Sequence, residues 1–182
     1  MKKYILLTQQ PYCCVPACLQ MILLKRGLPL ISQEDIGYDL GLTVPGEDKK
    51  LFRRVRAGKK PNAGWGTRVG KEIYSINHFF NKNRINLKEE YVFLTRKEEI
   101  KGFLKENLGV NDIIVCFDYK TLYGIGENTG HVSIIESLKR NDLTLIDPLY
   151  KVPKYRKVSL KKLSKAIEKH GKDKRGGFWI IS

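Results

Sequence analysis

The sequence predicts an α+β protein in which helices dominate the first half of the chain and an antiparallel sheet the second. Apolar residues recur at helical spacing in the first half, whereas short continuous apolar runs joined by a tight turn appear after residue 112. The 182 residues contain no internal repeat and no linker-like stretch, so we expect one domain over residues 1–182. With 42% hydrophobic residues, the chain is apolar enough to form a core.

The first predicted helix opens at Cys14 and ends at Gly27, with Pro16 in its first turn, where the missing N–H is not needed. A residue suited to capping a helix precedes each of the next three: Ser32, Thr67 and Thr95, the last in a capping box with Glu98. The helices after the first are predicted over residues 33–41, 69–82, 96–107 and 159–170. The stretch 43–67 is rich in Gly, Pro and Lys, which indicates a loop.

The strands are predicted from apolar and β-branched runs bounded by turn residues. They cover residues 86–93, 113–117, 131–138, 143–146 and 177–181. A turn at 139–142 joins the third and fourth of these into a hairpin. This pairing would place His131 and Asp147 at the same end of two neighbouring strands, where a carboxylate can reach the imidazole.

The net charge is +15, from 34 Lys and Arg against 19 Asp and Glu. Much of it lies in residues 48–60, with seven basic side chains and one acid, and in residues 151–175, with eleven and two. Such a charge attracts acidic partners in general. The sequence contains no zinc-finger spacing, RRM signature or convincing helix-turn-helix, which argues against nucleic acid. The charge is typical of a solvated basic surface, and an acidic peptide substrate or an acidic partner would also fit it.

Several other classes are excluded by simple patterns. No apolar run is long enough to span a membrane, and the apolar start of the chain is cut short at Thr8, so neither membrane insertion nor a signal peptide is expected. We therefore expect a cytoplasmic protein. Four cysteines are too few for a disulfide scaffold, and their spacing lacks the paired knuckles of a zinc site. No metal and no cofactor are expected.

Cys14 stands at the start of a helix, where the helix dipole and unpaired N–H groups favour a thiolate. A thiolate nucleophile needs an imidazole to exchange its proton, and the imidazole needs an acceptor that fixes its tautomer. His131 and Asp147 provide these two groups. Gln9, five residues before Cys14, can donate an amide N–H to a tetrahedral oxyanion beside the Cys14 backbone N–H. Gln10 is the alternative donor.

Three segments resemble the papain-like peptidases of the bacteriocin-processing, double-glycine-leader type. They are a Gln shortly before the helix-opening Cys-Val-Pro-Ala-Cys-Leu-Gln-Met-Ile-Leu, then Gly-His-Val-Ser-Ile-Ile, and then Leu-Ile-Asp-Pro. The resemblance implies a papain-like fold, with a helical subdomain packed on an antiparallel sheet and the cleft between them. It also implies a cysteine peptidase with Cys14 as nucleophile, His131 as base, Asp147 as orienting acid and Gln9 as oxyanion donor, acting on a peptide or protein.

The sequence departs from that family at three positions. Val15 stands where the family usually has Gly, the Gln lies five rather than six residues before Cys14, and Cys13 is a second, rival nucleophile. Deamidation and acyl transfer use the same acyl-enzyme, so a thiol amidohydrolase or acyltransferase remains open. The alternative from another class is an inactive peptidase-like module that binds a peptide or an acidic, polyanionic partner.

Overall fold

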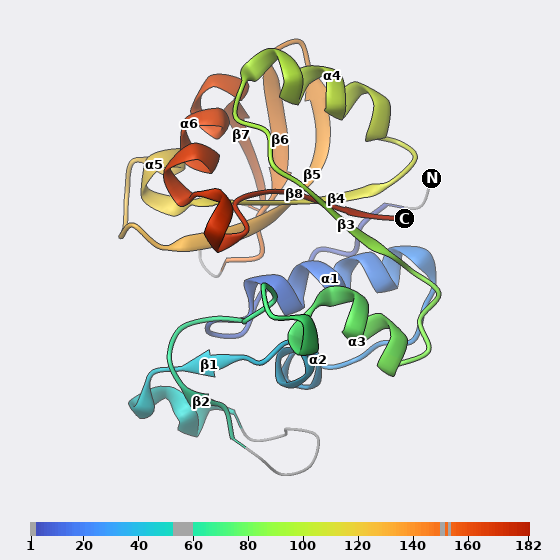
Figure 1. The fold of residues 1–182 in the computed structure, drawn as a ribbon, viewed down its shortest axis with the longest axis vertical. Helices are drawn as coiled ribbons and strands as arrows, with labels where there is room; N and C mark the ends of the chain where they lie inside the picture. Colours follow the sequence, from blue (N-terminus) through green and yellow to red (C-terminus); the bar gives the residue numbers. More distant parts are fainter. Residues whose placement is uncertain (1–2, 53–59, 150–151, 153) are drawn as a thin grey trace. The chain divides into compact units, whose positions relative to one another are not determined.

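The structure is a computed structural model that describes residues 3–52, 60–149, 152 and 154–182 (Figure 1). The chain forms two compact units. Unit 1 comprises Met1–Leu87 and Pro148–Tyr150, and unit 2 comprises Lys88–Asp147 and Lys151–Ser182. The helical half of the sequence belongs to unit 1 and the sheet to unit 2, which confirms the predicted α+β class. The prediction of one domain over the whole chain stays a prediction.

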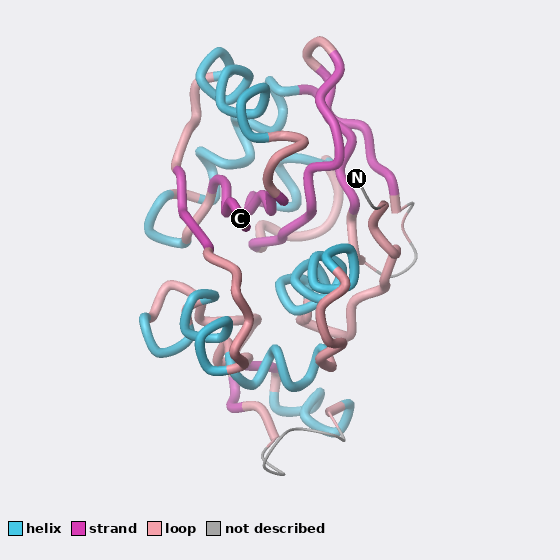
Figure 2. Tube along the Cα trace, turned by 90° about the vertical axis from the view of Figure 1, so that its right-hand side faces the viewer, coloured by secondary structure: helices cyan, strands magenta, loops and turns pink. Residues whose placement is uncertain are grey.

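Unit 1 is built mainly of helices, as the colouring in Figure 2 shows. Its α-helices are α1 (Cys14–Arg26), α2 (Gln33–Asp39) and α3 (Ile76–Lys82). Two 3-10 turns, η1 (Gly46–Leu51) and η3 (Glu72–Tyr74), and two short parallel strands, β1 (Thr43–Val44) and β2 (Asn62–Ala63), complete it. Every residue of α1 from Val15 to Leu23 is buried. A helix that is apolar on all sides in this way forms the centre of a unit rather than its surface.

Two predictions for unit 1 were wrong. The third helix begins at Ile76 rather than residue 69, because the Ser75 hydroxyl, and not Thr67, accepts the N–H of His78 and caps it. Ile73, expected on the buried face of that helix, lies in a 3-10 turn and is 62% exposed. The stretch 43–67, predicted as a loop, also contains β1, β2 and η1. Residues 53–59 of that stretch, with much of the first basic cluster, lie outside the described residues.

Unit 2 is a six-stranded antiparallel sheet in the order β3-β8-β4-β5-β6-β7. Its strands are β3 (Glu89–Val92), β4 (Asp112–Asp118), β5 (Gly130–Lys139), β6 (Asp142–Ile146), β7 (Tyr155–Ser159) and β8 (Gly177–Ile181). Its helices are α4 (Lys97–Asn107), α5 (Tyr119–Tyr123) and α6 (Leu160–His170). Residues of all three helices share one buried cluster with alternate residues of β4, β5, β6 and β7, so the helices cover one face of the sheet (Figure 1).

The hairpin of β5 and β6 has the connection that the sequence predicts. Ile134 pairs with Ile146 and Lys139 with Asp142, and Arg140 takes a left-handed conformation (φ 58°) in the turn. Two elements were not predicted, the five-residue α5 directly after β4 and the edge strand β7. The capping box at Thr95 was also wrong, because α4 begins at Lys97 without a side-chain cap.

Candidate active site

The functional geometry of unit 2 centres on a buried imidazole and carboxylate. His131 is the second residue of β5 and Asp147 directly follows β6, and a hydrogen bond of 2.8 Å joins His131 Nε2 to Asp147 Oδ1. The side chain of His131 is 7% exposed and that of Asp147 is fully buried. A carboxylate only accepts hydrogen bonds, so the hydrogen of this bond lies on Nε2. Proton exchange with any external group therefore falls to Nδ1, the other ring nitrogen.

The sheet register explains why the two side chains meet. The pairing of Ile134 with Ile146, continued by one residue, places Asp147 opposite Ser133. Side chains two residues apart on a strand lie on the same face, so His131 and Ser133 share a face with Asp147. Their common face depends on a β-bulge between Ile135 and Ser137, because the pairing of Lys139 with Asp142, continued without it, would place Asp147 opposite Ile134 and on the other face from His131.

Aromatic rings form the walls around His131. The rings of Phe117 and Tyr119 meet the imidazole edge to face, with centroids 5.7 and 5.3 Å away. Such contacts hold the ring in one orientation, because rotation of the imidazole would collide with its neighbours. Tyr119 begins α5, so this short unpredicted helix supplies one wall of the site.

Asp147 has a second charged neighbour. Nη1 of Arg156, on β7, lies 3.5 Å from Asp147 Oδ2, while His131 occupies Oδ1. Nearby, the hydroxyl oxygens of Tyr123 on α5 and Ser133 on β5 are buried and make no hydrogen bond among the described residues. Burial raises the pKa of the Tyr123 hydroxyl, and the Asp147 carboxylate raises it further. Tyr123 is therefore neutral beside the carboxylate.

Unit 1 carries the two adjacent cysteines in different environments. Cys14 is the first residue of α1 and is half-buried, whereas Cys13 is 0% exposed and packs with Leu42, Val44 and Phe52. Burial raises the pKa of the Cys13 thiol far above its ordinary value, and Cys14 and Glu34 raise it further. A thiol in such a site is an inert core residue. Cys14 instead lies beside the N–H groups of the first turn of α1, which have no partner within the helix.

The turn that leads to these cysteines is held in a strained conformation. Tyr12 has a left-handed backbone (φ 64°), which is costly for a side chain of this size. Its hydroxyl donates to Asp48 Oδ2 at 2.5 Å, and its ring meets Trp65 edge to face at 5.1 Å. The hydrogen bond to Asp48 raises the pKa of Tyr12 to about 12. These contacts fix the chain immediately before Cys14, and nothing in the sequence indicated them.

Val15 does not disturb the start of the helix. It has ordinary helical backbone geometry within α1 and is 4% exposed, so this position does not require the glycine that the family usually has. Val15 in place of the family's glycine is therefore accommodated as a buried residue of α1.

The glutamines before Cys14 differ in exposure. Gln9 is half-buried, and its backbone N–H donates to Pro148 O at 2.8 Å. Gln10 is exposed, and its backbone N–H donates to Gln33 Oε1 at 2.7 Å. Gln33 also donates to Thr8 O at 3.0 Å, so this side chain on α2 holds the whole segment. Of the two candidate donors, Gln9 has the more enclosed side chain.

Cys18 and Cys116 are buried and unbridged, as expected for core residues. Within the described ranges, no cluster of three or more His, Cys, Asp or Glu side chains is arranged to hold a metal ion. In the same ranges, no helix has both the length and the apolar character needed to cross a bilayer.

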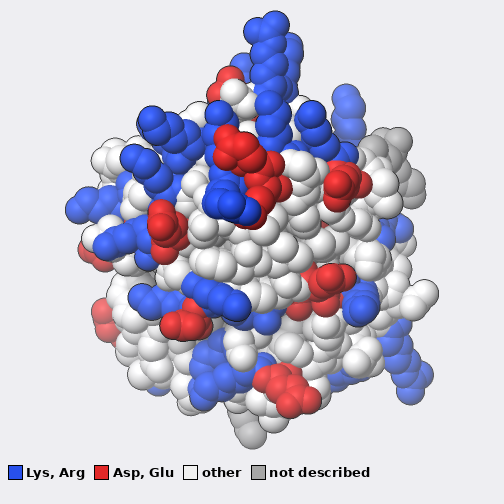
Figure 3. Space-filling view, turned by 45° about the horizontal axis from the view of Figure 1, so that its top comes forward, with Lys and Arg blue, Asp and Glu red and all other residues white. Residues whose placement is uncertain are grey.

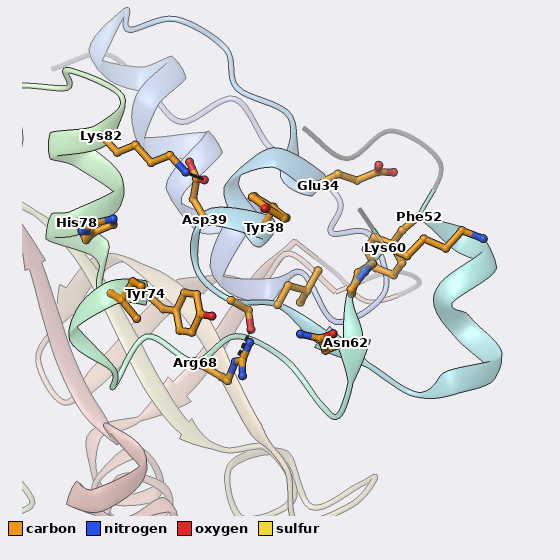
Figure 4. A pocket seen from close by; sticks show the side chains of 14 residues that line it. Glu34, Tyr38, Asp39, Phe52, Lys60, Asn62, Arg68, Tyr74, His78 and Lys82 are labelled. Carbon is orange, nitrogen blue, oxygen red and sulfur yellow. Dashed lines mark hydrogen bonds and ion pairs between the residues drawn. The ribbon is translucent and has the colours of Figure 1, made fainter. Parts of the chain in front are cut away.

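Unit 1 contains a separate pocket of about 360 Å³ between α2, α3 and the β2 region (Figure 4). Its lining includes the cations Lys60, Arg68 and Lys82 and the aromatic rings of Phe52, Tyr38 and Tyr74. The guanidinium of Arg68 lies over the Tyr74 ring and donates to Gly41 O at 3.0 Å. Lys82 forms an ion pair with Asp39 at 2.6 Å. No residue predicted for the catalytic site lines this pocket.

The charged side chains form no single-sign surface on the face drawn in Figure 3. Lys and Arg side chains spread over this face, with Asp and Glu side chains set between them. Such mixed charge is typical of a solvated surface, on which ion pairs contribute little.

No protein-family model and no curated protein matches the sequence. The solved structures that match the fold include the following two. One is a double-glycine motif protease from an AMS/PCAT transporter in complex with the leader peptide, with 14% identity, a TM-score of 0.52 and coverage of 98% of this chain and 89% of that one. The other is described as a C39-like peptidase from Bacillus anthracis, with 12% identity, a TM-score of 0.60 and coverage of 99% and 95%. The chain thus has the papain-like fold of the bacteriocin-processing C39 peptidases, as the sequence resemblance implied.

The predicted site residues are therefore distributed over both units. The structure brings His131 and Asp147 together within unit 2, and it places Cys14 and Gln9 in the same segment of unit 1. The pairing of Cys14 with His131 stays a prediction. Sequence reasoning missed Arg156, because its strand, β7, was not among the predicted elements.

Proposed function

We propose that the protein is a cysteine peptidase, or a related thiol amidohydrolase or acyltransferase, with Cys14 as nucleophile. The observation that carries the proposal is the buried hydrogen bond between His131 Nε2 and Asp147 Oδ1. It fixes the tautomer of an imidazole whose other nitrogen can exchange a proton with a thiol. The fold shared with C39 peptidases supports the same conclusion at the level of architecture.

In the proposed reaction, the Cys14 Sγ thiolate attacks the carbonyl carbon of a peptide bond and forms a C–S bond. The negative charge moves to the carbonyl oxygen, where the amide N–H of Gln9 and the Cys14 backbone N–H stabilise it. The C–N bond then breaks as the His131 imidazolium gives its Nδ1 proton to the leaving amine. Water, deprotonated by His131, hydrolyses the thioester and restores the thiol and a free carboxylic acid. Another amine in place of water would make the protein an acyltransferase.

Each residue has a physical reason for its role. Cys14 is preferred to Cys13 because it is half-exposed at a helix start, whereas Cys13 is buried with a raised pKa. Asp147 stabilises the imidazolium that forms during the reaction, because a buried carboxylate interacts strongly with a charge 2.8 Å away. Gln9 is preferred to Gln10 because its side chain is more enclosed.

The test is site-resolved alkylation with iodoacetamide at about pH 6, where an ordinary thiol is protonated and reacts slowly. We expect rapid, selective modification of Cys14, measured by mass spectrometry of tryptic peptides, and slow modification when His131→Ala removes the base. Cys13→Ala is the matched control and should label like the unaltered protein. Equal labelling of Cys14 with and without His131 would contradict the proposal. Cleavage of a mixed peptide library, lost in Cys14→Ala, would then define the reaction.

The pocket in unit 1 favours a second candidate function, a binding module for an acidic peptide. Its lining includes three cations (Lys60, Arg68 and Lys82), two acids (Glu34 and Asp39, the latter paired with Lys82) and three aromatic rings, and the small excess of positive charge suits a ligand that carries carboxylates. Calorimetric titration with a hexaglutamate peptide tests it. A salt-dependent affinity that Lys60→Glu abolishes, together with no selective alkylation of Cys14, would favour the module over the enzyme.

A further inference from the structure

Arg156 is the residue of unit 2 whose environment differs most from what its sequence context indicates. It lies in a run of basic residues, where a solvated side chain is the default expectation. In the structure its side chain is only 17% exposed. The buried part of the guanidinium is directed at the carboxylate that binds His131, so Arg156 belongs to the same cluster.

Three contacts fix the guanidinium of Arg156. Its Cζ lies 3.3 Å from the centroid of the Tyr123 ring, which is the geometry of a close cation–π contact. Its Nη1 donates to the Tyr119 hydroxyl at 3.3 Å and lies 3.5 Å from Asp147 Oδ2. Tyr119 also forms a wall of the imidazole site, so one aromatic residue contacts both the Arg156 guanidinium and the His131 ring.

The backbone places Arg156 on the correct face of the sheet. Arg156 pairs with Leu145 across β6 and β7, and Leu145 is two residues from Asp147, so all three side chains share a face. The Asp147 N–H also donates to Lys154 O at 2.8 Å, which ties the end of β6 to the chain entering β7. Main chain and side chain therefore hold Asp147 from the same side.

The charge of Arg156 determines which protonation states the Asp147–His131 pair can take. A carboxylate with no solvent exposure must be compensated by a positive charge or it takes up a proton. If the imidazole were its main compensation, the Asp147–His131 pair would retain a proton and His131 would remain charged. Arg156 is charged at every accessible pH, so it compensates Asp147 while His131 is neutral. The imidazole can then both accept and release a proton, as a general base and acid must.

We propose that Arg156 is a positioning residue that keeps Asp147 ionised and its Oδ1 directed at His131, with Tyr123 and Tyr119 holding the guanidinium in place. The consequence for turnover rests on the proposed peptidase function, but the effect on the His131–Asp147 pair does not. Polar groups near the pair include Tyr119 and Tyr123 of α5, Ser133 of β5 and Arg156 of β7. Of these, Arg156 is the permanent charge.

The first experiment measures proton binding rather than activity. The full chain carrying Cys14→Ala, with ¹⁵N-labelled histidine, is titrated by NMR, and the His131 signals are assigned by their loss in His131→Gln. With Arg156 present, the neutral imidazole should carry its hydrogen on Nε2. In Arg156→Met, the imidazolium should persist to a pH about one unit higher, because an opposing charge near the pair has been removed. Arg156→Lys keeps the charge and should restore most of the original titration.

The control is Lys157→Met, which removes the neighbouring cation from an exposed position on the same strand. It should leave the His131 titration unchanged. If Arg156→Met does not fold by circular dichroism, Arg156→Gln carries the same expectation and replaces it. A His131 titration that is identical in the folded Arg156 variants and the unaltered protein would overturn the proposal, and so would an equal shift in Lys157→Met.

The kinetic experiment separates this inference from the proposed function. On a peptide that the unaltered protein cleaves, Arg156→Met should lower kcat about tenfold or more with little change in KM, and Arg156→Lys should recover part of the loss. A shifted His131 titration in a protein with no cleavage activity would refute the peptidase function and leave the role of Arg156 intact. Cleavage that is unaffected by Arg156→Met would refute the role of Arg156 and leave the peptidase function intact.

Discussion

The adjacent residues Cys13 and Cys14 offer a sharp test of the structure, because replacing each should affect a different property. Cys13 is 0% exposed among Leu42, Val44 and Phe52, whereas Cys14 is half-buried at the helix start. Serine has nearly the shape of cysteine but adds a hydroxyl that needs a hydrogen-bond partner. At position 13 the side chains packed around it are apolar, so Cys13→Ser should pay the cost of an unsatisfied polar group.

The magnitudes follow from these environments. Burying an unpaired hydroxyl costs about 1–3 kcal/mol, so we expect Cys13→Ser to lower the free energy of unfolding by about 2 kcal/mol. Cys13→Ala removes one buried atom and should cost about 1 kcal/mol through the small cavity that it leaves. Cys14→Ala and Cys14→Ser should change stability by less than about 0.5 kcal/mol. Substitutions at position 14 should strongly reduce catalytic activity and the rate of alkylation, whereas substitutions at position 13 should change both only slightly.

Urea unfolding followed by circular dichroism measures the stability of all four variants. With a slope of about 2 kcal/mol per molar urea, Cys13→Ser should lower the midpoint by about 1 M. Iodoacetamide labelling of the same samples reports reactivity. A Cys14 variant that loses more stability than Cys13→Ser, or a Cys13→Ala variant that abolishes labelling at position 14, would show that the assignment of core and reactive cysteine is reversed.

Three other predictions concern pH and backbone. Burial raises the pKa of the Glu89 carboxyl, so the folded state holds this proton more tightly than the unfolded state does. The free energy of unfolding should therefore fall as the pH rises above the ordinary glutamate pKa. Glu89→Gln should reduce this pH dependence when urea unfolding is measured between about pH 4.5 and 7. The hydrogen bond from Tyr12 to Asp48 stabilises the fold fully below the ordinary tyrosine pKa, and this stabilisation is lost as the pH rises through about 12. The phenolate absorbance of Tyr12 should therefore appear near pH 12 and should move to lower pH in Asp48→Asn. An unchanged Tyr12 titration in Asp48→Asn would exclude the hydrogen bond. Gly177→Ala should cost about 2 kcal/mol or more, because φ is 114° and a Cβ would lie 2.6 Å from a strand carbonyl oxygen. Gly102→Ala, in open space on α4, should instead stabilise by about 0.5–1 kcal/mol, and equal effects of the two would contradict the backbone assignment.

The parts of the fold that were predictable are those encoded in short segments. The helix from Cys14 to Gly27, the β5–β6 hairpin and the final strand all depend on apolar spacing and turn residues within a few positions. The predictions failed where two local patterns competed. Thr67 and Ser75 are both good caps, and only the second has a helix directly after it. α5 and β7 lack the apolar run that identified the equally short strands β6 and β8.

The candidate site shows the same division. The position of His131 and Asp147 at the same end of two strands was predictable from the tight hairpin, whereas their common face depends on the β-bulge between Ile135 and Ser137, which was not predicted. The choice between Cys13 and Cys14 was not, because adjacent residues have the same local context and differ only in what packs against them. The buried position of Arg156 was not predictable for a related reason. A run of lysines and arginines does not indicate which member turns inward.

Composition, periodicity and a few motifs in this chain therefore establish the α+β class, the order of its main elements and the set of residues capable of thiol chemistry. Folding adds the burial of Cys13, the aromatic walls around His131 and the second cation on Asp147. The physical reason is that capping and periodicity act between neighbours in the chain, whereas desolvation and charge compensation depend on residues that are distant in sequence and adjacent only after the strands pair.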